Sequence, residues 1–142
     1  MSTDSASVVA ANEELYAAFE AGDLDRMKSL WVGPDGGAVA MCVHPGGEFV
    51  RGTDAVLRSW ALVMANAEDL QFILTDVQTV VKGELATVHC TEIILRPGVG
   101  QDPFVSSHAV ATNGFIREDG RWRMWLHHAS PVMSTSEGEP GG

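Results

Sequence analysis

Apolar residues recur at steps of three and four in the first third of the chain, the spacing of one face of an α-helix. The first such stripe predicts a helix over about residues 6–21 and consists of Val8, Ala11, Leu15, Ala18 and Phe19. One of residues 3–5 is a candidate N-cap, and Gly22 is typical of a helix stop. The chain therefore opens on an amphipathic helix.

Two further helices are predicted before residue 66. Asp23 is a typical N-cap for the second helix, whose shared face consists of Leu24, Met27, Leu30 and Trp31. The Gly-Thr-Asp sequence at 52–54 predicts a turn and a cap, with a third helix continuing to about residue 65. The inner side of this helix is expected to carry Val56, Leu57, Trp60, Val63 and Met64.

The remaining pattern is that of β-structure. A short strand is expected over 38–43, between a loop at 33–37 and the His-Pro-Gly-Gly break at 44–47. Longer strands are expected over 70–81, 84–95, 104–117 and 121–132, with turns at 82–83 and at Asp119-Gly120 and a longer connection at 96–103. Helices first and strands last predict an α+β cone, in which three helices cover a curved, mostly antiparallel sheet and enclose a small-molecule pocket.

Composition and charge narrow the classes of partner. The chain has 142 residues and a formal net charge of −10, so one domain over residues 1–133 and a disordered tail over 134–142 are expected. Nine Lys and Arg residues do not build the basic face that nucleic acid or an anionic membrane requires. Because the start carries no signal-peptide pattern, and Cys42 and Cys90 lie in apolar runs, buried thiols and a cytoplasmic location are expected.

Three short motifs resemble the NTF2-like superfamily and, within it, the SnoaL-like group. The sequence Tyr16-Ala17-Ala18-x-x-Ala21-Gly22-Asp23-Leu24-Asp25 is similar to the opening of ketosteroid isomerase. The Gly-Thr-Asp-Ala-Val stretch at 52–56 and the Asp-Gly-Arg-Trp turn at 119–122 are also typical of the superfamily. The resemblance covers about residues 5–132 and implies the cone fold, which hosts isomerases, cyclases, dehydratases, epoxide hydrolases and non-catalytic binders.

The resemblance implies roles for some residues, whereas other catalytic positions of the isomerase are occupied by different residues here. Tyr16 matches the tyrosine of the isomerase oxyanion hole, and Trp60 matches an aromatic member of its pocket. His44, followed by Pro45, occupies the place of the general-base aspartate, and Thr112 occupies that of the second oxyanion donor. Steroid isomerisation by that mechanism is therefore not predicted.

His44 is the sharpest catalytic candidate, since a neutral imidazole at the pocket mouth accepts a proton near pH 7. The alternative is a loop-end histidine that hydrogen-bonds the backbone. Tyr16 is expected to donate a hydrogen bond to a substrate carbonyl or, alternatively, to a neighbouring strand side chain. An inward Glu92 would form an acid/base pair with His127; an edge position pairing with Arg96 or Arg117 is the other interpretation.

Strand alternation orders the remaining candidates. The resemblance implies that Trp125, His127 and Ala129 face the cavity. Trp122, Met124, Leu126 and His128 are then expected to face outward into a homodimer. The alternative for His127 and His128 is a structural role, in which their ring nitrogens are hydrogen-bonded within the protein. One of Thr112 and Asn113 is expected to orient a polar ligand atom, whereas Trp31 and Trp60 are either pocket walls or core residues.

No cofactor and no metal are expected, since neither phosphate-loop nor metal-ligand spacings occur in the sequence. Two functions stay open. One is a cofactor-independent isomerase, cyclase or hydratase/dehydratase, with His44 as general base, Tyr16 as hydrogen-bond donor and His127 as a further catalytic group, acting on a small, partly apolar molecule. The other is a non-catalytic module that binds a small ligand or mediates dimeric contacts.

Overall fold

The first half of the chain folds into the three expected helices. The computed structural model describes residues 2–35, 38–98, 100 and 103–133. Helix α1 (Thr3–Ala21) is followed by α2 (Leu24–Leu30) and later by α3 (Thr53–Ala65). Helix α1 begins earlier than expected because the Ser2 hydroxyl caps it, accepting a hydrogen bond from the Ser5 amide at 3.0 Å. Gly22 ends α1 with φ 64°, and Asp23 caps α2 as predicted.

Six strands form one sheet in the order β2-β1-β6-β5-β4-β3. They are β1 (Met41–Val43), β2 (Val50–Arg51), β3 (Gln71–Lys82), β4 (Leu85–Pro97), β5 (Phe104–Glu118) and β6 (Arg121–Pro131). Strand β1 pairs in parallel with β6, and the other neighbours are antiparallel. The α+β cone is confirmed, although β1 is shorter than expected and β2 was not predicted. The expected tail at 134–142 lies outside the described residues.

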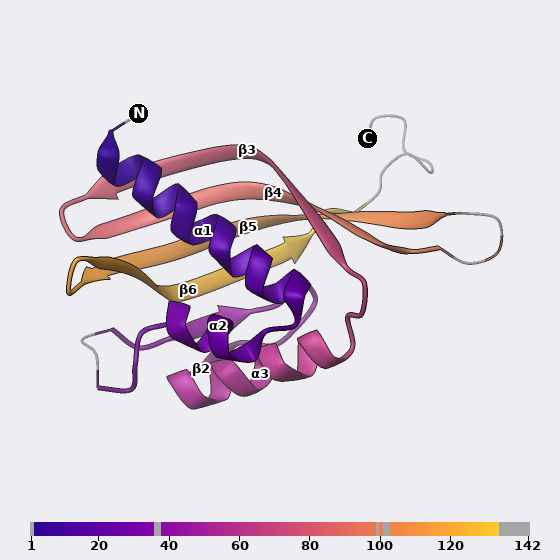
Figure 1. Cartoon of the computed structure of the whole chain (residues 1–142), viewed down its shortest axis with the longest axis horizontal. Helices are drawn as coiled ribbons and strands as arrows, with labels where there is room; N and C mark the ends of the chain where they lie inside the picture. Colours follow the sequence, from indigo (N-terminus) through magenta and orange to yellow (C-terminus); the bar gives the residue numbers. More distant parts are fainter. Residues whose placement is uncertain (1, 36–37, 99, 101–102, 134–142) are drawn as a thin grey trace.

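Helices cover the concave face of this sheet. Figure 1 shows α1 running diagonally across the long strands, with α2 and α3 beside β1 and β2. The largest fully buried side chains between the layers include Trp31, Trp60, Phe115 and Met124. Burying each such side chain contributes about 1.5–3 kcal/mol, so the apolar stripes of the helices account for the packing of the two layers.

A β-bulge in β6 changes which residues face inward. The β5–β6 register shifts between Gly114, opposite Leu126, and Phe115, opposite Met124, so Trp125 is the extra residue. The expectation that Trp122 and Met124 face outward is therefore wrong, since their exposed fractions are 9% and 0%. Gly114 permits the bulge, because a Cβ there would lie 3.1 Å from the Trp125 ring.

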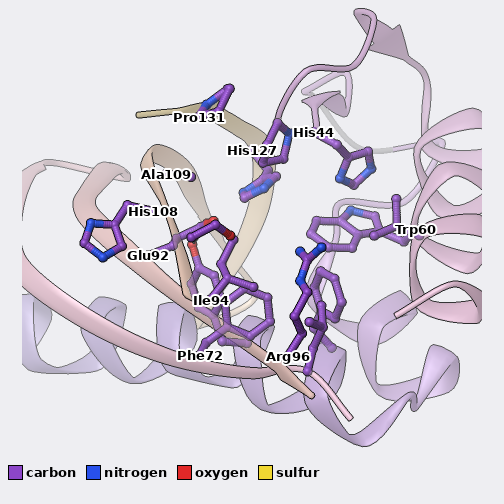
Figure 2. Close-up of a pocket in the computed structure, with 16 residues that line it drawn as sticks. His44, Trp60, Phe72, Glu92, Ile94, Arg96, His108, Ala109, His127 and Pro131 are labelled. Carbon is purple, nitrogen blue, oxygen red and sulfur yellow. Dashed lines mark hydrogen bonds between the residues drawn. The ribbon is translucent and has the colours of Figure 1, made fainter. Parts of the chain in front are cut away.

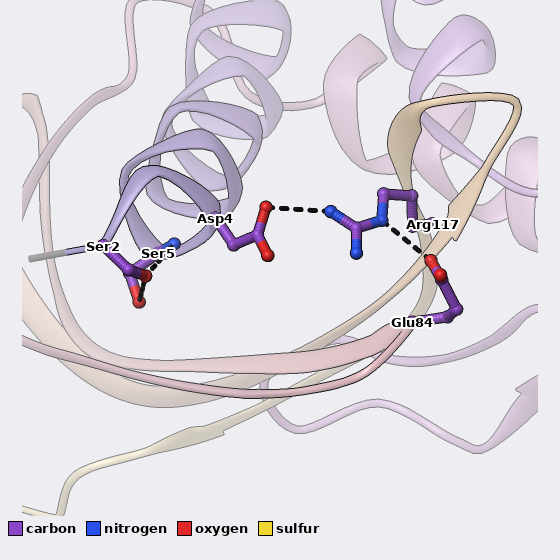
Figure 3. Close-up of polar contacts among 5 residues, drawn as sticks. All are labelled: Ser2, Asp4, Ser5, Glu84 and Arg117. Atoms are coloured by element: carbon purple, nitrogen blue, oxygen red, sulfur yellow. Dashed lines mark hydrogen bonds and ion pairs between the residues drawn. The ribbon is translucent and has the colours of Figure 1, made fainter.

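An arginine of β5 ties α1 to the sheet (Figure 3). Arg117 donates from Nη1 to Asp4 at 2.8 Å and from Nε to Glu84 at 2.7 Å. Its guanidinium also lies 4.8 Å from the centre of the Trp122 ring. These contacts join the start of α1 to β5 and to the turn before β4.

Candidate active site

A cavity of about 260 Å³ lies between α1, α3 and the concave face of the sheet. Figure 2 shows side chains converging on it from β4, β6, α3 and the end of β1. Its walls are largely apolar and include Phe19, Trp60, Phe72 and Ile94. Polar side chains enter at a few points only, among them those of Tyr16, His44, Glu92, Arg96 and His127. Such a chamber suits a small, mostly apolar ligand held by a few polar contacts.

His44 follows β1 directly and lines the cavity, as predicted from its place before Pro45. Its Nε2 lies 3.0 Å from the Ser59 hydroxyl, which itself donates to the Val56 carbonyl at 2.6 Å. Because the Ser59 proton is used on Val56, we assign the proton of His44 to Nε2, which donates to Ser59 and leaves the lone pair on Nδ1. The thiol of Cys42 lies 3.4 Å from Nε2 and 4.0 Å from Nδ1. Burial lowers the pKa of His44 to about 4, so the imidazole is neutral at pH 7.

His127 lies beside His44 and is held by an asparagine. The two imidazole rings are 6.0 Å apart, and both lie against Trp60. Nδ1 of His127 is 2.6 Å from Oδ1 of Asn113, whose Nδ2 donates to Asn12 at 2.7 Å and to Tyr16 at 3.2 Å. Because Asn113 uses its nitrogen on those partners, His127 donates from Nδ1 and keeps its lone pair on Nε2.

Burial keeps His127 neutral as well. Its pKa is lowered to about 3, mainly by burial and further by the neighbouring His44 and His128. The prediction that His127 points inward and His128 outward is confirmed, since their side chains are buried and exposed respectively.

Tyr16 and Glu92 form the opposite side of the polar network. The Tyr16 hydroxyl donates to Oε2 of Glu92 at 2.6 Å, and Glu92 is only 3% exposed. Burial raises the pKa of Glu92, although the hydrogen bond from Tyr16 opposes that effect. Burial and the nearby Glu92 also raise the pKa of Tyr16, so its hydroxyl keeps its proton. The hydrogen bonds thus form a chain in which His127 donates to Asn113, Asn113 donates to Tyr16, and Tyr16 donates to Glu92.

The fold and the sequence place this chain among known proteins. The model of the SnoaL-like domain matches residues 8–134. The chain belongs to the SnoaL-like family. The resemblance to the NTF2-like superfamily is thereby confirmed.

A solved structure of a candidate dehydratase of the NTF2-like family from Streptomyces avermitilis is 47% identical to this SnoaL-like domain. The two superpose with a TM-score of 0.84 over 93% of this chain and 98% of that one. A candidate calcium/calmodulin-dependent protein kinase type II association domain from Thiobacillus denitrificans is 29% identical, with a TM-score of 0.74 over 88% and 94% of the two chains.

The curated proteins include one relative at a lower level of identity. The F-box protein SKIP8 of Arabidopsis thaliana is 27% identical over 127 residues. This match covers 89% of the SnoaL-like domain and 50% of the F-box protein, so the chain spans about half the length of that curated relative.

Four predicted ligand-contact residues, Trp31, Thr112, Asn113 and Trp125, do not line the cavity of this SnoaL-like domain. Trp31 is buried in the core with its ring 6.4 Å from that of Trp60, behind the wall. Thr112 lies on the outer face of β5, where its hydroxyl is 3.2 Å from Nε2 of His89. Trp125 lines a separate shallow hollow with Met41 because of the bulge. Asn113, the alternative to Thr112, points inward, but it is fully buried outside the cavity lining and bonds protein side chains instead of facing a ligand.

Asn12, Ser59 and Arg96 contribute to the site and were not identified from the sequence. Asn12 stands on the apolar stripe of α1, and a polar residue at such a position indicates a buried hydrogen bond. Arg96 continues the alternation of Glu92 and Ile94 along β4, so its inward direction was open to the same reasoning. Ser59 gave no signal beyond its place before Trp60.

Two further properties concern only the described part of the chain. Within residues 2–35, 38–98, 100 and 103–133, no three His, Cys, Asp or Glu side chains come together as a metal site. None of the described helices has the combined length and apolar character that crossing a membrane requires.

Proposed function

We propose that this SnoaL-like domain is a cofactor-independent lyase that removes water from a small, mostly apolar hydroxy-carbonyl compound. One observation carries the proposal: His44 and Glu92 line the same cavity, and burial displaces their pKa values in opposite directions. A pair of titratable groups whose pKa values are pushed apart supplies a base and an acid at the same pH. The 47% identity to a candidate dehydratase supports the same reaction class.

In the proposed step, Nδ1 of His44 takes a proton from the carbon next to the carbonyl. The electron pair of that C–H bond forms the C=C bond as the C–O bond on the neighbouring carbon breaks. Protonated Glu92 gives its proton to the departing oxygen, which leaves as water. The proton on His44 then returns to the Glu92 carboxylate, which restores the starting state. Elimination and its reverse, water addition, use the same groups.

The other polar residues hold these two in place. Tyr16 donates to Oε2 of Glu92 and so leaves the second carboxyl oxygen for the leaving group. Nε2 of His127 accepts a hydrogen bond from a substrate hydroxyl, because its Nδ1 proton is committed to Asn113. Tyr16 thereby acts through Glu92.

Turnover by the purified chain tests the proposal. A set of small β-hydroxy ketones and β-hydroxy aldehydes is incubated with the protein, and formation of the conjugated product is followed by ultraviolet absorbance. Replacing a general base costs about 10²–10⁴-fold in rate, so His44→Ala is expected to lose activity on this scale. His89→Ala on the outer face is the matched control and retains the activity. Equal activity of His44→Ala and the unaltered chain would overturn the role of His44.

A non-catalytic binding function is the second candidate. The observation in its favour is that the Tyr16 hydroxyl is already used on Glu92, so it does not wait for a substrate carbonyl. A binder predicts that small aromatic or terpenoid molecules raise the melting temperature without turnover. In that case His44→Ala keeps the ligand-induced rise, whereas the lyase loses turnover in the same variant.

We also propose that the chain forms a homodimer through the outer face of its sheet. The expected patch of Trp122 and Met124 is internal, but other apolar side chains occupy that face. Ile73, Val80, Leu85 and Val110 are 48%, 60%, 52% and 49% exposed, and the strand registers place all of them on the outer side. Covering such a patch with a second copy removes it from water. A cytoplasmic location remains our proposal, supported by the two free, buried cysteines.

A further inference from the structure

The charged side chain of Arg96 points to a class of substrate for this cavity. Along β4, Glu92 and Ile94 belong to the alternation that is buried against the interior, and Arg96 continues it as an exposed residue. Arg96 is the one lysine or arginine among the residues that line the cavity. Figure 2 shows its guanidinium running past Ile94 in the direction of Trp60. The cavity therefore has a cationic group at the end where the strand becomes exposed.

This cation has no acidic partner among the described residues. Arg26, Arg117 and Arg123 each have a carboxylate within 4.0 Å, whereas no such pair includes Arg96. Asp69 shares a neighbouring surface hollow with Arg96 but does not reach ion-pair distance. Glu92 is the acidic residue of the described cavity lining, and its Oε2 accepts a hydrogen bond from Tyr16 at 2.6 Å. Arg96 thus offers an anion a positive charge that no described carboxylate neutralises, although the chain carries a net charge of −10.

We infer that the hydroxy-carbonyl substrate also carries a carboxylate, which binds Arg96, an inference that rests on the proposed lyase function. The planar guanidinium presents two parallel N–H donors that match a carboxylate. Arg96 and Glu92 are four residues apart on one strand face, or about 13 Å along the strand. The long arginine side chain shortens that gap. A carboxylate at Arg96 and a hydroxyl at Glu92 therefore belong to one molecule with a single apolar ring or a short chain between them.

Binding of two isosteric probes tests the inference. Isothermal titration calorimetry compares 3-phenylpropionate with 3-phenylpropionamide, which has the same shape and no charge. The unaltered chain is expected to bind the acid about tenfold or more tightly than the amide, as a charge-assisted hydrogen-bond pair requires. Arg96→Gln removes that preference and Arg96→Lys keeps part of it. Arg58→Gln, on an exposed part of α3, is the matched control and leaves it unchanged.

The outcomes separate this inference from the proposed reaction, because binding is measured without turnover. A preference for the acid that disappears only in Arg96→Gln supports the inference even where no dehydration is found. Equal binding of the acid and the amide, binding of neither, or an unchanged preference in a folded Arg96→Gln variant overturns it. If only neutral hydroxy ketones are turned over, the proposed lyase function holds, but Arg96 does not recognise the substrate and the inference fails.

Discussion

Replacing Asn113 by Asp offers a direct test of the polar network behind the cavity. The substitution keeps the shape of the side chain and puts a carboxylate where Oδ1 now lies 2.6 Å from Nδ1 of His127. The new charge stabilises the imidazolium form of His127. At a charge separation near 4 Å and an effective dielectric constant of about 20, the attraction amounts to about 4 kcal/mol. Since a tenfold change in proton affinity corresponds to about 1.4 kcal/mol, the expected gain is roughly a thousandfold.

The pKa of His127 therefore moves from about 3 towards its ordinary value in Asn113→Asp. Nitrogen and carbon NMR of histidine-labelled protein measures this pKa and also reports which nitrogen carries the proton. Thr112→Asp is the matched control, because it places the same charge one residue away on the outer face. The reasoning is refuted if folded Asn113→Asp leaves His127 titrating as before, or if His127 of the unaltered chain carries its proton on Nε2.

Three other predictions concern stability and assembly. Tyr16→Phe removes the hydrogen bond that lowers the pKa of Glu92, so this pKa rises further and the free energy of unfolding falls by about 1–3 kcal/mol. Carboxyl NMR measures the pKa and urea denaturation measures the free energy of unfolding. An unchanged Glu92 pKa would contradict the prediction. Because the folded-state pKa of His127 is depressed, its contribution to stability is present above pH 6.5 and is lost as pH falls towards about 3. His127→Gln should lessen that fall by about 1.4 kcal/mol for each pH unit, and equal slopes in urea denaturation would exclude the assignment. Val110→Asp places a charge on the outer face of the sheet and is expected to yield a 15.2 kDa monomer in sedimentation. Leu62→Asp on α3 is the control and leaves the dimer intact. A monomeric unaltered chain would refute the proposed dimer.

The helices and long strands were predictable because local signals specify them. Asp23 and Gly22 each act through the backbone beside them, and the predicted cap and stop are both present. The Asp119-Gly120 turn likewise has φ values of 52° and 77°, as a two-residue hairpin requires. Strand β2 is two residues long, too short for any alternation to appear, and depends on its pairing with β1.

The site was predictable to the extent that strand alternation held. The expectation that His127 faces inward is confirmed, the direction of Glu92 was left open, and alternation narrowed the β5 candidate to one of two neighbouring residues. Alternation failed at Trp125 because a bulge inserts one residue, and nothing local distinguishes a bulged strand that is apolar on both faces. The partner of Tyr16 could not be derived, since the bond to Glu92 joins residues 76 positions apart.

Burial in one cavity lowers the pKa of an imidazole and raises the pKa of a carboxyl group. A pH titration of the unaltered chain by NMR, with labelled histidine and glutamate side chains, measures both groups at once. The account predicts that His44 titrates with a pKa of about 4 and that Glu92 titrates above the ordinary value of 4.5. A His44 pKa near 6.5 together with a Glu92 pKa at or below 4.5 would contradict it.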